Sequence, residues 1–471
     1  MQRKQYLAKN TLLFAFNSIG TRIITFLLVP LYTKAFATSD YGVIDLVTTI
    51  ATLFVPIITI NIGEAVMRFS LDENADKDKI INVGTLFAGL SMLSGTSIFL
   101  ILLKFPQINV NGWIIYFFCI TQGLYQIFAC SLRGQEKLLS FAIGNIIMTL
   151  LAAVLNIVFL LVFKWGINGY FLSYIVSYVV AGGYCFVVGN IPSTFMKFTI
   201  DKLLMKQMVK YSIVLVPNSL MWWVMNSSDH IMVITMINTA ANGIYAISYK
   251  LPSILAALSS VFNQAWSYSA IHEDKSDDRE AFSNKMFDKL VRFNLLINVA
   301  LMCIMKPLMR VYVEDAYFEA WMYTPYLLTG NFFLTISTFL STSYTVNKDN
   351  KGFLFSGSTG ALMNIALNFL LIPIIGLHGA ALATCISYIT VFIYRVADTR
   401  KYIHIHVFKN EYVICYILMI LTAISMVIPG WIGQSILIIE VLVMIMLNYK
   451  FFFELLQMGG TIMKKVIRKS E

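Results

Sequence analysis

Residues 139–163 read LSFAIGNIIMTLLAAVLNIVFLLVF, and no residue in this stretch is charged. A helix crosses the hydrocarbon core of a bilayer with about 20 mainly apolar residues, so the stretch is long enough to span a membrane. The whole sequence of 471 residues is 58% hydrophobic and 13% charged, whereas soluble domains are about 45–50% apolar and about 25% charged. This composition excludes an ordinary soluble protein and predicts an all-α integral membrane protein.

Similar apolar runs lie on both sides of this stretch. Together they predict about 14 transmembrane helices, near residues 11–36, 42–63, 82–104, 113–132, 139–163, 167–189, 209–235, 243–265, 291–312, 321–344, 353–375, 377–396, 412–429 and 432–453. The first run is too long for the core of a signal peptide and has no obvious small-residue cleavage site, so we expect it to be retained.

The charged residues fall in short segments between the runs. The sequence has 35 Lys and Arg against 25 Asp and Glu, a net charge of +10. Most of the basic residues lie in every second segment, and one such segment is assigned Arg395, Arg400, Lys401 and Lys409. By the positive-inside rule, this alternation predicts that both termini are cytoplasmic. A charge dispersed in this way argues against a nucleic-acid partner.

Two long basic segments, 190–208 and 267–290, lie on the predicted inner side. Their interspersed apolar residues are typical of amphipathic segments that rest on membrane lipids. An equal alternative is that the two segments are solvated linkers, which only set the topology of the chain in the membrane.

Short sequence matches recur between the two halves of the chain. At nearly one offset the matches are Asn17-Ser18 with Asn218-Ser219, Tyr41-Gly42 with Asn242-Gly243, and residues 166–169 with 376–379. Six predicted helices separate the copies, so both copies have the same orientation in the membrane. The repeat predicts two six-helix lobes, 1–200 and 201–410, related by a pseudo-twofold axis along the membrane normal. Residues 411–471 form helices 13 and 14 and a basic cytoplasmic tail.

Several polar side chains lie inside the predicted spans, where they are costly unless they face a cavity or a partner. The first span carries Arg22 with polar neighbours on the same helix face, and the seventh span carries a polar stripe at helical spacing. We expect these groups to bind substrate, or to hold the lobes together through a pair between a cation and Asp229. The predicted site residues are Ser18, Arg22, Thr25, Asn218, Trp222, Asn226, Asp229 and Lys250.

Three further acidic residues, Asp45, Glu64 and Glu440, lie within or near the predicted spans. Glu64 and Arg68 are four residues apart at the end of the second span, a spacing that predicts an ion pair serving as a gate or a structural contact. Asp45 is expected to be water-exposed near the outer start of that span. Glu440 stands alone among apolar residues, so we expect it to be structural or protonated.

Catalytic and cofactor motifs are missing from the sequence. It has no phosphate-binding loop of the Gly-x-x-x-x-Gly-Lys-Ser/Thr type, no His-Glu-x-x-His and no Gly-x-Ser-x-Gly. Its six cysteines show no Cys-x-x-Cys spacing. We therefore expect a protein that is not an enzyme and that uses no cofactor or metal.

Local motifs near the start of the chain resemble those of a known family. The family is that of bacterial polysaccharide transporters, the Wzx-type flippases for O-antigen and capsule repeat units. It belongs to the multidrug/oligosaccharidyl-lipid/polysaccharide (MOP) exporter superfamily. The motifs are NSIGTR at 17–22, PLY at 30–32, DYG at 40–42, GEAVMRF at 63–69 and FNQAW at 262–266.

The resemblance implies that the chain moves an undecaprenyl-diphosphate-linked oligosaccharide from the inner to the outer leaflet by alternating access. It also implies that Arg22 and Lys250 meet the diphosphate. The membrane that it implies is the inner membrane of a bacterium. Membrane lipids, a coupled H⁺ or Na⁺ and polysaccharide-assembly proteins are the further partners we expect. Two alternatives stay open: a multidrug or cation antiporter of the same superfamily, and a membrane-embedded glycosyltransferase or polymerase.

Overall fold

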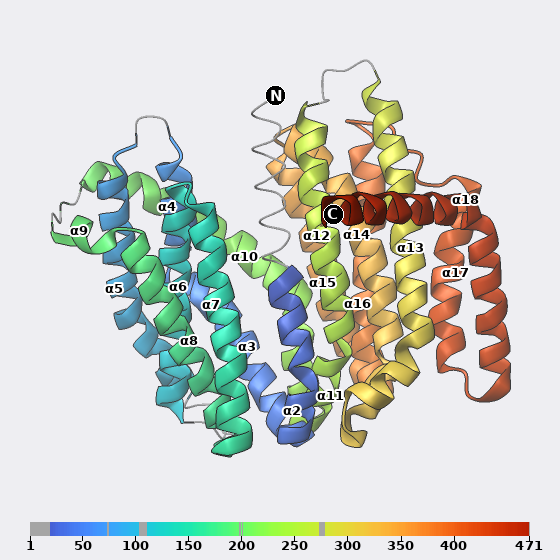
Figure 1. Cartoon of the computed structure of the whole chain (residues 1–471), viewed down its shortest axis with the longest axis horizontal. Helices are drawn as coiled ribbons and strands as arrows, with labels where there is room; N and C mark the ends of the chain where they lie inside the picture. Colours follow the sequence, from blue (N-terminus) through green and yellow to red (C-terminus); the bar gives the residue numbers. More distant parts are fainter. Residues whose placement is uncertain are drawn as a thin grey trace. The chain divides into compact units, whose positions relative to one another are not determined.

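The computed structural model describes residues 19–72, 75–102, 111–196, 199, 201–272 and 278–470. Throughout these ranges the regular elements are helices, drawn along the chain in Figure 1. The predicted all-α membrane fold is therefore confirmed.

After the helical residues 19–27, the elements follow one another with short connections. In chain order they are α2 (Val29–Ala35), α3 (Thr38–Ile58), α4 (Ile62–Ser70), α5 (Lys77–Leu102), α6 (Gly112–Gly134), α7 (Leu138–Ile157), the π-helix η1 (Val158–Val162), α8 (Gly166–Val188), α9 (Ile191–Met196), α10 (Lys202–Met236), α11 (Thr239–Ser248), α12 (Lys250–His272), α13 (Arg279–Tyr312), the 3₁₀-helix η2 (Asp315–Met322), α14 (Thr324–Val346), α15 (Asn350–Ile375), α16 (Leu377–Thr399), α17 (Asn410–Val427) and α18 (Gly430–Ser470).

Nine spans within the described residues are long and apolar enough to cross a membrane, or ten if α11 and α12 form one bent span. Each predicted run from 42–63 onward contains a helix, and the first run lies partly outside the described residues. The total of fourteen stays a prediction. The run at 243–265 is broken between α11 and α12 with a bend of 42°. Pro252, which lacks a backbone N–H, lies in the first turn of α12, where proline is tolerated.

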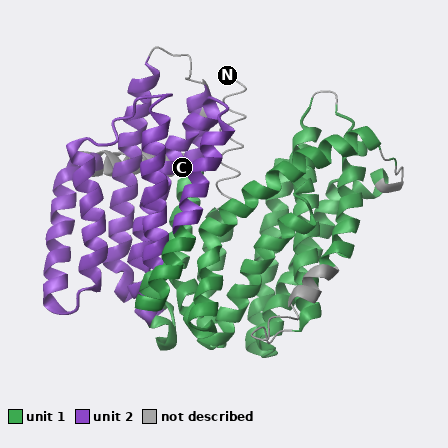
Figure 2. Cartoon of the chain, turned by 180° about the vertical axis from the view of Figure 1, so that it is seen from behind, with its two compact units in different colours: residues 1–261, 312–318, 364–380 green, residues 262–311, 319–363, 381–471 purple. Residues whose placement is uncertain are grey.

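The chain divides into two compact units (Figure 2). Unit 1 comprises residues 1–261, 312–318 and 364–380, and unit 2 comprises residues 262–311, 319–363 and 381–471. The predicted lobes 1–200 and 201–410, and the segment 411–471, stay predictions.

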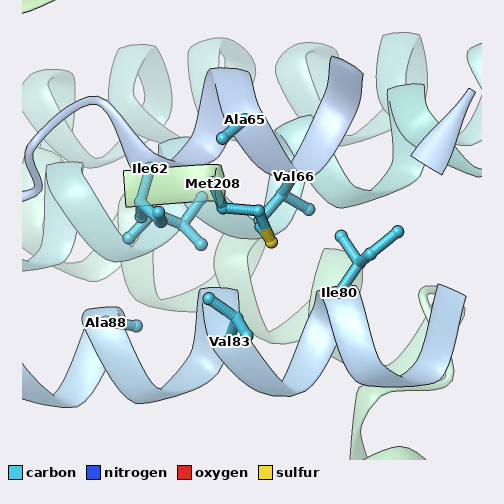
Figure 3. Close-up of a cluster of buried hydrophobic side chains, with 8 residues drawn as sticks. Ile62, Ala65, Val66, Ile80, Val83, Ala88 and Met208 are labelled. Atoms are coloured by element: carbon cyan, nitrogen blue, oxygen red, sulfur yellow. The ribbon is translucent and has the colours of Figure 1, made fainter. Parts of the chain in front are cut away.

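Unit 1 has a tightly packed apolar cluster (Figure 3). The buried side chains come from three consecutive helices and from the distant α10, namely Ile62, Ala65 and Val66 of α4, Ile80, Val83 and Ala88 of α5, Ile127 of α6, and Met208 of α10. Lipid tails are as apolar as these side chains, so close packing rather than exclusion of water holds such helices together. The cluster joins α10 to the first helices of the chain.

Unit 2 corrects one sequence assignment. Arg395 was grouped with a polar segment, but it lies within α16 and its residue is 0% exposed. Its Nε donates to Ser356 Oγ at 3.0 Å and its Nη1 donates to the Ser337 carbonyl at 3.1 Å. These acceptors on α14 and α15 compensate part of the cost of burying the guanidinium. Nη2 is buried and has no hydrogen-bond partner among the residues that the structure describes.

Candidate functional site

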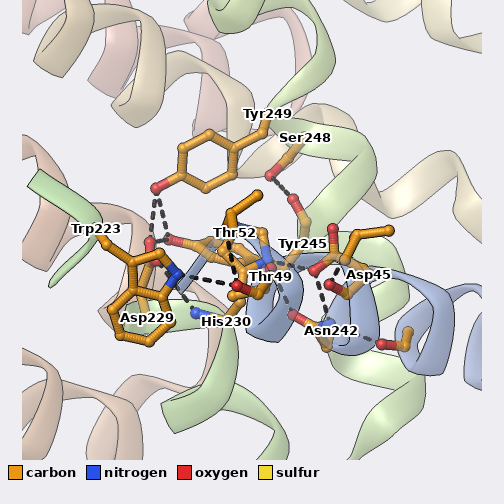
Figure 4. A network of polar contacts seen from close by, with 12 residues as sticks. Asp45, Thr49, Thr52, Trp223, Asp229, His230, Asn242, Tyr245, Ser248 and Tyr249 are labelled. Carbon is orange, nitrogen blue, oxygen red and sulfur yellow. Dashed lines mark hydrogen bonds and ion pairs between the residues drawn. The ribbon is translucent and has the colours of Figure 1, made fainter. Parts of the chain in front are cut away.

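A buried polar network lies in unit 1 where α3, α10 and α11 meet (Figure 4). We call it the Asp45–His230 network, and it consists of Asp45, Asp229, His230, Asn242, Tyr245 and Tyr249. Its residues come from three helices and from the break before α12.

Two glycines bring α3 and α11 close enough for the network to form. A β-carbon on Gly42 would lie 1.8 Å from the Thr239 carbonyl oxygen, and one on Gly243 would lie 2.0 Å from the Thr38 carbonyl oxygen. Thr38 and Thr239 are the first residues of α3 and α11. The two contacts are therefore equivalent. They bring together Tyr41-Gly42 and Asn242-Gly243, the two segments that match each other in the sequence repeat.

His230 and Asp45 form the centre of the network. His230 Nδ1 lies 2.6 Å from Asp45 Oδ2 and 3.1 Å from Asn242 Oδ1. Because both neighbours are acceptors, Nδ1 carries the hydrogen that it donates. Asn242 Nδ2 donates to Asp45 Oδ2 at 3.0 Å and to the Gly42 carbonyl at 3.0 Å. Asn242 thus connects the ion pair to the backbone at the glycine crossing.

Asp229 is surrounded by hydrogen-bond donors. Its residue is 1% exposed. Its Oδ2 accepts hydrogen bonds from Tyr245 Oη at 2.7 Å and Tyr249 Oη at 2.6 Å, and its Oδ1 accepts one from the His230 backbone N–H at 3.1 Å. Both carboxylate oxygens thus have donors, and the three hydrogen bonds hold the Asp229 side chain in one orientation inside the unit.

Lys250 lies beside the network at the start of α12. Its Nζ is 5.6 Å from the centroid of the Tyr41 ring, and its charge interacts with the Asp45 carboxylate. An ammonium over an aromatic face gains about 0.5–2 kcal/mol. The side chain is half-buried, so it is held by unit 1 and still partly accessible.

The other predicted site residues show mostly local contacts. Arg22 and Thr25 are exposed on the helical residues 19–27, and Thr25 Oγ1 bonds to the carbonyls of its own helix. Ser18 lies outside the described residues.

The other predicted residues on α10 are partly buried. Asn218 and Trp222 are half-buried, and Asn226 Nδ2 donates to the Trp222 carbonyl. The structure thus brings Asp229 and Lys250 to the network, and it joins Asn226 to Trp222 within α10.

Asp45 corrects a sequence expectation. It was expected to be water-exposed, but its side chain is only 16% exposed and is paired with His230. The reason is that the close crossing of α3 and α11 covers this part of α3. Asn242, Tyr245 and Tyr249 were also missed as site residues. One feature of the sequence could have indicated two of the network residues. Asp45 and Asn242 lie close in sequence to Gly42 and Gly243, the glycines that match in the repeat.

The predicted ion pair between Glu64 and Arg68 is also corrected. Arg68 Nη1 lies 2.6 Å from Asp72 Oδ1, and Glu64 Oε1 lies 3.8 Å from Arg133 Nη1. Arg68 is in the last turn of α4, so its side chain reaches past the helix end, whereas Glu64 faces α6. Among the described residues, no group of three or more His, Cys, Asp or Glu side chains is placed to hold a metal ion.

The family model described as "Polysaccharide biosynthesis protein" matches residues 7–271. The chain belongs to this family. No match was found among curated proteins. The fold is similar to that of several solved transporters, all with low sequence identity.

A structure titled "Lipid II flippase MurJ, inward closed conformation" is 16% identical, covers 94% of this chain and 100% of its own, and has a TM-score of 0.65. An inward-facing multidrug resistance MATE family transporter of the MOP superfamily is 13% identical, covers 83% of this chain and 94% of its own, and has a TM-score of 0.62. A MATE transporter variant from Vibrio cholerae is 11% identical, covers 85% and 98%, and has a TM-score of 0.56. The chain is thus a multi-pass membrane protein with the fold of MOP-superfamily transporters.

Proposed function

We propose that this protein is a flippase, not an enzyme, that moves an undecaprenyl-diphosphate-linked oligosaccharide repeat unit from the inner to the outer leaflet by alternating access. The observation that carries the proposal is the half-buried Lys250 ammonium beside the Asp45–His230 network. Family membership and the fold shared with a lipid II flippase support the same class of substrate.

The charges in unit 1 favour an anionic substrate. Asp45 and Asp229 already accept hydrogen bonds from His230, Asn242, Tyr245 and Tyr249. A multidrug or cation antiporter needs a carboxylate that is available to an organic cation. Arg22, in contrast, is exposed, and Lys250 is partly accessible. A diphosphate is the group that two such cations bind well.

Outward movement of an anion is favoured by an inside-negative membrane potential, by about 2.3 kcal/mol per charge per 100 mV. Transport can then proceed without ATP hydrolysis. The inner-membrane location, the cytoplasmic termini, a coupled H⁺ or Na⁺ and contacts with polysaccharide-assembly proteins remain predictions.

Arg22→Gln and Lys250→Gln variants test the proposal in cells that depend on this protein for a surface polysaccharide. We expect the complete lipid-linked repeat unit to accumulate on the inner leaflet, with export reduced at least about tenfold, the equivalent of 1.4 kcal/mol. Lys250→Arg keeps the charge and should retain more activity than Lys250→Gln. Lys34→Gln, at an exposed residue of α2, is the control with the same change of charge.

Other outcomes would contradict the flippase. Incomplete glycan on the outer face would support a glycosyltransferase or polymerase. Unchanged glycan together with altered resistance to cationic dyes would support a multidrug antiporter.

A further inference from the structure

Unit 2 contains a groove of about 800 Å³ that is separate from the network described above. Its lining comes from the first part of α13, the start of α17 and the middle of α18. The residues that matter here are Lys285, Lys289, Arg292, Lys409, Met446 and Leu447. We call it the basic groove.

One wall of the basic groove is a single face of α13. Asp288 and Lys289 each lie three or four residues from Lys285 and from Arg292, which places the four residues on the same side of the helix. Lys285 is exposed and Lys289 is half-buried. The face therefore presents its charges to the groove.

Arg292 holds the groove together and is not available to a ligand. Its Nε lies 2.9 Å from Asp288 Oδ1, and its Nη2 pairs with Glu411 at the start of α17. Its Nη1 donates to Asn448 Oδ1 of α18 at 3.0 Å. One guanidinium thus joins the three helices that form the groove, and two carboxylates neutralise it.

The lysines of the groove differ from Arg292 in their charge partners. Lys285, Lys289 and Lys409 have no ion pair with any carboxylate in the described part of the chain. Lys409 Nζ lies 5.7 Å from the centroid of the Tyr412 ring, at the mouth of the groove. With four cations and two carboxylates, the groove has a net charge of +2.

The part of the lining that α18 contributes includes apolar side chains. Met446 and Leu447 of α18 are 74% and 36% exposed. The apolar spans are Asn410–Val427 and Gly430–Tyr449. The groove thus includes Lys409 just before one span and Tyr449 at the end of the other. Basic and aromatic residues at such positions mark the level of the lipid headgroups.

We propose that the basic groove binds one anionic glycerophospholipid, with the phosphate on Lys285, Lys289 and Lys409 and an acyl chain against Met446 and Leu447. A free phosphate satisfies the lysines but leaves Met446 and Leu447 unused. This inference does not depend on what the protein transports. Its consequence is that the lipid joins α13 to α17 and α18 at the membrane surface.

The test uses the full-length protein, purified in detergent and stripped of lipid. Native mass spectrometry measures its binding of phosphatidylglycerol, phosphatidylcholine and inorganic phosphate. The variant carries Lys285→Gln, Lys289→Gln and Lys409→Gln. The matched control carries Lys34→Gln, Lys77→Gln and Lys164→Gln, which remove three exposed lysines of unit 1. Size-exclusion chromatography checks that both remain folded.

We expect phosphatidylglycerol to bind the parent and the control alike, and to bind the groove variant on the order of a hundredfold more weakly, since each lysine near an anionic lipid contributes about fivefold. Equal loss in both variants would overturn the assignment to the groove. Phosphatidylcholine binding as tight as phosphatidylglycerol, or full competition by inorganic phosphate, would overturn the anionic lipid. Met446→Asp provides a second check, because it should weaken lipid binding without reducing the number of lysines.

Discussion

Gly42 and Gly243 cross so closely that a β-carbon on either one would overlap a backbone carbonyl of the other helix. The neighbouring carbonyls belong to Thr239 and Thr38, so neither helix can relieve the overlap by moving a side chain. We expect Gly42→Ala and Gly243→Ala each to reduce the free energy of unfolding by about 3 kcal/mol or more.

Thermal unfolding in detergent measures this effect. Gly183→Ala is the control, because a β-carbon there meets nothing within 4 Å. A Gly42→Ala protein as stable as the Gly183→Ala protein would show that the helices are not in close contact.

The Asp45–His230 pair should be coupled in a double-mutant cycle. Removing one partner leaves a charge in a buried site, which costs about 3–5 kcal/mol. We expect Asp45→Ala and His230→Ala each to show such a loss of stability, and the double variant to lose much less than the sum. Additive losses would argue against direct contact between the two side chains.

Arg395 allows a comparison between two replacements of similar length. Lys keeps a buried charge but cannot reach both Ser356 and Ser337, whereas Met removes the charge and fills the space. We expect Arg395→Met to be more stable than Arg395→Lys by about 1–3 kcal/mol in chemical denaturation. The reverse order would indicate that the charge itself is required in unit 2.

Asp349 should contribute stability that depends on pH. Hydrogen bonds from the Gly352 backbone N–H and from Tyr402, together with the nearby Lys401 ammonium, lower the pKa of the Asp349 carboxyl below its ordinary value of 3.8. The folded state thus favours the ionised form. The contribution of the Asp349 carboxylate to the free energy of unfolding is therefore complete above about pH 4. It is lost as the pH falls through the lowered pKa that this carboxyl has in the folded protein.

Melting curves of Asp349→Asn and Asp349→Ala test this. Asn keeps an acceptor for the first turn of α15 and loses only the charge, so its melting temperature should lie between those of the parent and of the Ala variant at pH 7. The difference between the parent and Asp349→Asn should disappear at low pH. A difference that does not change with pH would assign the effect to the hydrogen bonds alone.

The apolar runs predicted most of the helices because each helix in a bilayer satisfies its own backbone hydrogen bonds. Pro252 indicated a bend in the run at 243–265, since a proline kinks a membrane helix. It did not indicate that α11 would end at Ser248, before the proline. The burial of Arg395 was missed because a charge near the end of an apolar run is usually exposed. Only the packing of α14, α15 and α16 provides Ser337 and Ser356 as its partners.

The sequence alone determined the membrane class, the approximate helix positions and the family, because these depend on hydrophobicity along the chain and on short local motifs. It also indicated Asp229 and Lys250, since polar groups inside apolar runs require a reason. The tertiary structure decided which groups meet. Asp45, His230 and Asn242 come together only because two glycines let α3 and α11 touch, and the basic groove exists only because Arg292 joins three helices. Contacts of this kind depend on distances across helices, which the spacing of residues along a single helix does not contain.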